Sequence, residues 1–159
     1  TIIEGGTGTF SESYEQPKDM PERLESGTPN LSGITGLRAG VQFVRNKGIA
    51  RIFQHEMQLI QLFYDTLSRD SRIQFYTKRP DPLHFVPVLP FNIVGMHSEE
   101  AGRRLNQRGI AVRAGLHCAP SAHRLMGTLE QGADRICPSL FTTREDIQRC
   151  TAARLQIAT

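Results

Sequence analysis

The residues with the most reactive chemistry in this chain lie between Arg113 and Pro120, in the stretch RAGLHCAP. Cys118 follows His117 directly, and Arg113 lies five residues before the cysteine. Positive charge near a thiol favours the thiolate, which is the nucleophilic form. A free cysteine is more often a small buried apolar residue, however, and a single Cys-His pair is a weak signal. The residues alone leave both interpretations of Cys118 open.

Three other places in the chain offer groups that could hold an anion. Arg135 follows Asp134 on a predicted strand, so its guanidinium could hold a carboxylate in a bidentate fork or form a structural ion pair with Asp134. The run Gly5-Gly6-Thr7-Gly8 could surround a phosphate with backbone N–H groups, although without the lysine of a P-loop it favours an ordinary flexible loop. Thr28 offers a hydroxyl on a turn, and turn chemistry alone explains it.

The cysteines and histidines do not predict a metal site. His117, Cys118 and His123 supply two imidazoles and a thiol, but joint ligation by two adjacent residues is awkward. The three cysteines are odd in number and form no CxxC pair, which argues against a disulfide framework and a four-thiolate zinc site. We therefore expect a reducing cytoplasm, with Cys137 buried in a strand and Cys150 packed within the last helix.

Length and composition predict one globular domain without nucleic-acid or membrane partners. The chain has 159 residues, of which 38% are hydrophobic and 22% charged, and its net charge of +3 is spread over interspersed residues. No transmembrane helix is expected, because the chain has no apolar run long enough, and residues 1–6 lack the basic and apolar regions typical of a signal peptide. Because it begins with Thr1 rather than methionine, we expect it to start inside a longer protein.

The hydrophobic periodicity predicts which elements carry these groups. Residues 1–30 are typical of loop and turn, and Pro17, Pro21 and Pro29 interrupt regular structure there. The remaining pattern predicts helices over 32–47, 49–68, 98–108 and after a capping box at 142–145, and strands over 73–76, 86–94, 110–113 and 133–137. This order is typical of an α+β fold with a small, mainly antiparallel sheet covered by helices.

Taken together, these segments resemble one family, the class V aminotransferase-like pyridoxal-phosphate enzymes, in particular the cysteine desulfurase and selenocysteine lyase branch. The resemblance covers almost the whole chain, and four stretches carry it in order: 5–8, 23–30, 113–119 and Arg135. It implies the C-terminal small domain of a fold-type I enzyme. Residues 1–30 would be the tail of the large cofactor-binding domain, and 31–159 the small domain with a linking helix.

The resemblance implies roles for the residues around the cysteine. Cys118 would attack the sulfur of a cysteine substrate bound to pyridoxal phosphate, which would leave a persulfide on Cys118 and release alanine. Arg135 would hold the substrate carboxylate, and Arg113 and His117 would line the same pocket. An acceptor protein would then take the sulfur from the persulfide.

The resemblance also implies contacts with the cofactor. Thr28 would reach the cofactor phosphate of a neighbouring subunit in a homodimer, and Gly5 and Gly6 would lie near that contact. The lysine that carries the cofactor in this family lies upstream of the glycine-rich run, and no counterpart precedes Thr1. We therefore expect a C-terminal fragment that does not bind the cofactor covalently by itself.

Four residues depart from the family pattern and keep other functions open. Leu116 stands where many relatives have a second histidine, Cys137 and Pro138 replace small residues, and Asp134 places a negative charge beside the carboxylate-binding arginine. A class V aminotransferase, epimerase or isomerase that does not use the cysteine is one alternative. A folded module without catalysis, serving dimerisation or scaffolding, is another.

Overall fold

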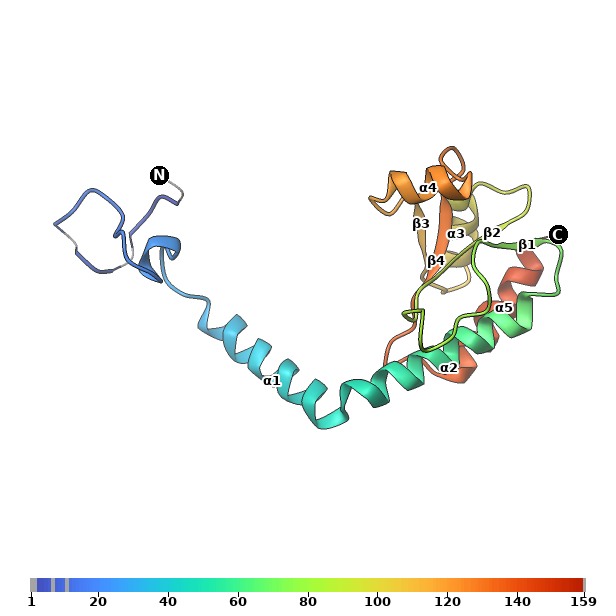
Figure 1. Ribbon diagram of the computed structural model, residues 1–159, viewed down its shortest axis with the longest axis horizontal. Coiled ribbons are helices and arrows are strands. Elements are labelled where there is room, and N and C mark those ends of the chain that lie inside the picture. The colour runs from blue at the N-terminus through green and yellow to red at the C-terminus, as the bar shows by residue number, and fades with distance from the viewer. Residues whose placement is uncertain (1–2, 7, 11, 159) are drawn as a thin grey trace. The chain divides into compact units, whose positions relative to one another are not determined.

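The computed structural model describes residues 3–6, 8–10 and 12–158. It divides into two compact units, Thr1–Lys47 and Gly48–Thr159, whose elements are labelled in Figure 1. Thr7 of the glycine-rich run lies outside the described residues. None of the described helices is both long and apolar enough to cross a membrane.

The first unit holds a short 3-10 helix, Glu22–Leu24, and helix α1, Leu31–Lys47. The side-chain oxygen of Asn30 accepts a hydrogen bond from the backbone N–H of Gly33 at 2.9 Å, which satisfies one of the free donors at the start of α1. The predicted apolar stripe of α1 is present but exposed; its residues are Ile34, Leu37, Val41 and Val44. Periodicity thus predicted the helix, but the described residues of this unit contain no second apolar surface that covers the stripe.

The second unit contains the core, which begins with helix α2, Ile49–Leu67. One face of α2 is fully buried, including Ile60, Phe63 and Leu67. The helix ends where the sequence predicted, and the backbone N–H of Ser68 closes its last turn on the carbonyl of Tyr64 at 2.8 Å.

Four short strands form one antiparallel sheet, as the sequence predicted. They are β1 (Ile73–Phe75), β2 (Leu89–Ile93), β3 (Arg113–Gly115) and β4 (Ala133–Ile136), and they lie in the order β1-β2-β4-β3. The register aligns Phe75 with Phe91 and Phe91 with Asp134, and Ala114 lies opposite Asp134 on the other side of β4. Because side chains alternate along a strand, these residues share one face of the sheet.

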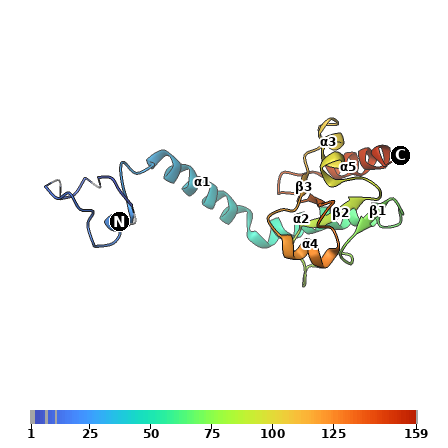
Figure 2. The same cartoon turned by 90° about the horizontal axis from the view of Figure 1, so that it is seen from above.

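Helices cover the face of the sheet that carries these residues. Helix α3 (Ser98–Asn106) contacts β2, β3, β4 and helix α5 (Arg144–Ile157), and α5 also contacts α2. Figure 2 shows α3 and α5 on one side of the strands and helix α4 (Pro120–Met126) on the other. The arrangement confirms the expected α+β fold.

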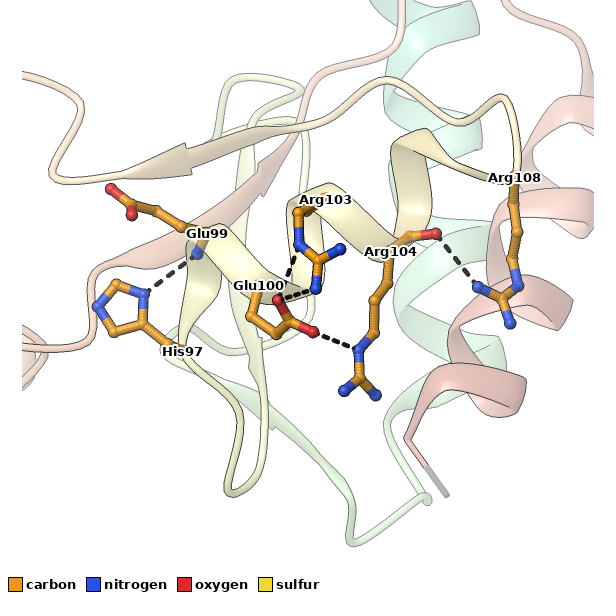
Figure 3. A network of polar contacts seen from close by, with 6 residues as sticks. All are labelled: His97, Glu99, Glu100, Arg103, Arg104 and Arg108. Carbon is orange, nitrogen blue, oxygen red and sulfur yellow. Dashed lines mark hydrogen bonds and ion pairs between the residues drawn. The ribbon is translucent and has the colours of Figure 1, made fainter.

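A network of polar contacts lies along the exposed side of α3 (Figure 3). The Nδ1 atom of His97 accepts a hydrogen bond from the backbone N–H of Glu99 at 3.3 Å and thereby caps the helix. The Glu100 carboxylate accepts from Arg103 and Arg104, each at 2.6 Å. Exposed ion pairs of this kind contribute little stability, so burial of the opposite side of α3 is what fixes the helix on the sheet.

The structure differs from the sequence prediction at several points. The predicted strand over 110–113 is a connecting segment, since the backbone N–H of Ile110 bonds the carbonyl of Leu105 at the end of α3 and β3 starts only at Arg113. Helix α4 was not predicted. The capping box of α5 joins Thr143 to Asp146 and lies one residue later than the sequence suggested.

An ionisable pair lies within this core. The side chains of Asp134 on β4 and Arg154 on α5 are both fully buried. The Arg154 guanidinium carbon lies 3.3 Å from the centre of the Phe91 ring, a cation–π contact that partly replaces its lost hydration. Burial raises the pKa of the Asp134 carboxyl to about 7, against the lowering effect of Arg154. Burial also lowers the pKa of Arg154 to about 10.

The raised pKa of Asp134 predicts how stability depends on pH. Because its pKa in the folded chain, about 7, lies above the usual 3.8, the native state binds this proton more tightly than the unfolded state. Proton binding by Asp134 should therefore add its full stabilisation to the free energy of unfolding below pH 4. This stabilisation should be lost as the pH rises through 7. Asp134→Asn should flatten this slope in urea unfolding between pH 4 and 8. The exposed control Glu130→Gln should retain it, and an equal slope in all three chains would contradict the prediction.

Candidate functional site

Two arginines face each other across strands β3 and β4. The register pairs Arg113 with Arg135, so both side chains leave the same face of the sheet, opposite the helical layer. Arg113 is exposed and Arg135 is half-buried. The buried Nε atom of Arg135 has no hydrogen-bond partner among the described residues. Like charges directly across an antiparallel pair are destabilising, so two guanidiniums here suit an anion that both can bind.

Asp134 does not neutralise this pair of guanidiniums. Strand alternation points its side chain into the core, away from Arg135, and neither of its carboxylate oxygens has a hydrogen-bond partner in the described part of the chain. The charge of Arg154 lowers the pKa of the Asp134 carboxyl and so partly compensates it. The structural ion pair between Asp134 and Arg135 that the sequence allowed is therefore wrong, and Arg135 keeps its charge for the open face.

His117 and Cys118 form the centre of a tight turn. The backbone N–H of Ala119 donates to the carbonyl of Leu116 at 2.9 Å, and the two residues between them have φ values of 52° and 57°. Positive φ at both central positions is the pattern of a type I′ turn, which normally favours Asn and Gly. Two residues with Cβ atoms in this region cost of order 1–3 kcal/mol each, so their surroundings must hold them there.

The ring of His117 is anchored to the first residue of β4. Its Nε2–H donates to the carbonyl of Ala133 at 2.9 Å, because a carbonyl can only accept. In the neutral ring this leaves a lone pair on Nδ1, which is buried and has no partner among the described residues. Burial lowers the pKa of His117, and the charges of Arg135 and Arg113 lower it further, against the raising effect of the hydrogen bond to Ala133. His117 is therefore neutral at neutral pH, and the charges of both arginines act on its pKa.

The three cysteines have different surroundings. Cys118 is exposed on its turn, which excludes the interpretation that it only packs the core. Cys137 is also exposed, contrary to the prediction, because it follows the last residue of β4. It lines a cavity of about 300 Å³ together with residues 109–112 and residues at the start of α5. The register places this cavity at the opposite end of β4 from the Cys118 turn. Cys150 is buried as predicted, and burial raises the pKa of its thiol.

The glycine-rich run and Thr28 lie together in the first unit. The backbone N–H of Gly27 donates to the carbonyl of Gly6 at 2.6 Å. Gly5 has a φ of 132°, and a Cβ there would lie 3.2 Å from the Cβ of Ser26. Gly5, Gly6 and Thr28 are all exposed. The structure thus brings the three expected phosphate-binding residues onto two adjoining backbone segments.

Two further residues near the cysteine were not predicted to belong to the site. His123 on α4 and Thr128 are almost fully buried, and their Nδ1 and Oγ1 atoms are 2.8 Å apart. The His123 ring lies 5.8 Å from that of His117, measured between centroids. Sequence reasoning considered His123 only as a metal ligand, but no group of three potential ligands that could hold a metal occurs among the described residues.

Comparison with known proteins gives consistent matches. A sequence model of the aminotransferase class-V family matches residues 2–150. The chain is 34% identical over 140 residues to the cysteine desulfurase of Yersinia pseudotuberculosis serotype O:1b (strain IP 31758), which is 87% of this chain and 33% of that protein. The apo structure of cysteine desulfurase from Thermococcus onnurineus NA1 has a TM-score of 0.79 at 26% identity and covers 99% of this chain and 37% of that one.

A more distant structure shares the fold. It is a C-DES mutant with glycine covalently linked to its PLP cofactor, and it has a TM-score of 0.63 at 17% identity over 84% of this chain and 31% of that one. The chain thus spans about one third of the length of the proteins it matches. The family it matches uses pyridoxal phosphate. Since the family match runs along nearly the whole sequence, the chain belongs to the aminotransferase class-V family.

Proposed function

We propose that this chain is the C-terminal part of a pyridoxal-phosphate-dependent cysteine desulfurase that converts L-cysteine to L-alanine and a persulfide on Cys118. The observation that carries the proposal is the pairing of Arg113 with Arg135 beside the turn that presents Cys118. A cysteine substrate needs a cation for its carboxylate and a nucleophile for its sulfur. The two arginines and Cys118 lie in the same unit, and the charges of both guanidiniums lower the pKa of His117 beside the cysteine in sequence.

In the proposed reaction, the Cys118 thiolate forms a bond to the substrate sulfur while the substrate Cβ–S bond breaks. The electron pair of the broken bond stays on carbon, which takes a proton to become the methyl group of alanine. Cys118 then holds the extra sulfur as a persulfide. The neutral His117 has a free Nδ1 lone pair that can take the thiol proton, and the Arg135 guanidinium holds the carboxylate in place.

The residues in the first unit fit the phosphate of the cofactor. When bound, pyridoxal phosphate supplies an electron sink for the amino-acid substrate. Gly5 and Gly6 offer exposed backbone N–H groups, and Thr28 adds a hydroxyl on the adjoining turn. We include in the proposal that Thr28 serves the active site of a second subunit, so that the enzyme is a homodimer.

The lysines of this chain do not fit the covalent attachment of the cofactor. Lys18, Lys47 and Lys78 are all exposed. A lysine that reacts with a carbonyl at neutral pH needs burial or a neighbouring cation to lower its pKa. The proposal therefore assigns the attachment lysine to a part of the enzyme outside these 159 residues.

The location of Cys118 also suits transfer of the sulfur to another protein. Its thiol is exposed at the tip of a turn, where a second thiol can approach it. All three cysteines are free, which fits a reducing compartment. We extend the proposal to a cytoplasmic enzyme with a protein sulfur acceptor.

The nucleophile is the first point to test. In the proposed full-length enzyme, Cys118→Ala should lower sulfur release from L-cysteine by at least about 100-fold, because the step has no other acceptor for the sulfur. Cys137→Ala, at the far end of β4, should change it less than about twofold. Sulfide and alanine assays give both numbers. Unchanged turnover in the Cys118 variant would favour an aminotransferase or epimerase.

The bidentate carboxylate contact can be tested separately. Arg135→Lys keeps the charge but loses the planar fork, so the KM for cysteine should rise about tenfold in the proposed enzyme. Arg124→Lys, an exposed arginine on α4, is the matched control and should leave KM unchanged. Steady-state kinetics measures both, and an equal KM for the two variants would remove Arg135 from the substrate site.

The assignment of the lysine to another part of the enzyme predicts how this chain behaves alone. Mixed with equimolar pyridoxal phosphate and reduced with borohydride, the 159-residue chain should show no stoichiometric adduct at a single lysine, because its lysines are all exposed. Absorbance and peptide mass spectrometry give the answer. A uniform adduct at Lys18, Lys47 or Lys78 would show that the chain carries its own attachment site.

A further inference from the structure

We propose that His123 and Thr128 are positioning residues that hold His117, and through it the Cys118 turn, in its reactive conformation. The proposal rests on the proposed function for the role of Cys118. The observation behind it is a buried polar pair that the proposed reaction does not itself use. His123 and Thr128 are 2% and 1% exposed, and their side chains form a hydrogen bond of 2.8 Å.

The turn needs support from outside itself. His117 and Cys118 both have positive φ, and only the Leu116–Ala119 hydrogen bond closes the turn internally. One external anchor is the hydrogen bond from the His117 ring to the carbonyl of Ala133. This anchor fixes one edge of the ring against β4 and leaves its other edge to be held by a neighbour.

Helix α4 supplies that neighbour. The helix starts at Pro120, directly after the turn, and the backbone N–H of His123 bonds the carbonyl of Ala119 at 3.2 Å. The His123 ring meets the His117 ring at 5.8 Å with an interplanar angle of 45°. The turn is therefore held by one histidine ring on the β4 side and by a second on the α4 side.

Thr128 connects the two sides. Its side chain bonds His123, its backbone N–H donates to the carbonyl of His123 at 2.9 Å, and its carbonyl accepts from Gly132 at 2.8 Å. Gly132 directly precedes β4, and a Cβ there would lie 2.9 Å from the backbone of Gly115 at the end of β3. A shift of Thr128 would therefore displace both the histidine rings and the start of β4.

This arrangement has a chemical consequence for His117. As long as its Nε2–H is held on Ala133, the Nδ1 atom remains the only proton-accepting site of the neutral ring. Without His123 against it, the ring could turn and exchange its two nitrogens. His123 and Thr128 therefore select which nitrogen of His117 can accept a proton.

The reactivity of the thiol tests this proposal in the 159-residue chain. Iodoacetamide labels both exposed cysteines, and the rate at Cys118 divided by that at Cys137 gives an internal ratio. Because unfolding would make the two rates equal, the ratio is recorded only where circular dichroism shows the variant to be folded. Thr128→Val removes the hydroxyl at nearly constant volume, and the ratio should fall about fivefold, the effect of one lost hydrogen bond. Thr128→Ser keeps the hydroxyl and should restore the ratio. Peptide mass spectrometry follows both sites.

A spectroscopic readout covers the case in which the valine variant does not fold. Nitrogen-15 NMR of the unsubstituted chain should show His117 as a single neutral form with its proton on Nε2. His123→Asn keeps a hydrogen-bonding group toward Thr128 but loses the ring contact, and should give a mixture of both neutral forms. An unchanged labelling ratio in Thr128→Val, or a single unchanged form of His117 in His123→Asn, would overturn the proposal.

These results are independent of the test of the proposed function. The labelling ratio and the NMR signals are recorded without cofactor or turnover. If Cys118→Ala left sulfur release unchanged, the proposed reaction would fail while the labelling and NMR results still decided whether His123 and Thr128 hold the turn.

Discussion

The antiparallel pairing of β3 with β4 is the constraint on which the candidate site depends. Its register places Arg113 opposite Arg135 and brings Gly115 beside Ala133, so that the following turn lies over the start of β4. A slip of one residue would turn Arg135 into the core and Asp134 onto the open face. The separation of charge between the two faces therefore follows from the register.

The core on the helical side of β4 contains two buried ionisable side chains. Arg154 stacks on Phe91 and compensates part of the charge of Asp134, and the two side chains are completely buried. Breaking one partner of a buried pair usually destabilises a protein much more than removing an exposed pair. Strand β4 thus connects two distinct electrostatic environments: a dry one on the helical side, where protonation is favoured, and an open one that attracts anions.

The sequence predicted the helices and the sheet better than the details of the site. Periodicity located α1 and α2 because their apolar stripes repeat over many residues, and alternation sufficed for β4. The apolar run over 110–112 predicted a strand wrongly, since β-branched composition does not reveal whether a pairing partner is in register. The turn at His117 and Cys118 gave no signal, because neither residue is typical of positive φ. The roles of His123 and Thr128 depend on contacts across α4 that no local pattern encodes.

The ends of the sheet have a further consequence. Both of its outer strands, β1 and β3, are only three residues long, and both belong to a sheet whose central strands are little longer. An outer strand this short exposes few unpaired backbone groups to a foreign strand. The sheet is therefore a poor template for edge-to-edge pairing between copies, and amyloid-like association at high protein concentration is disfavoured at these two borders.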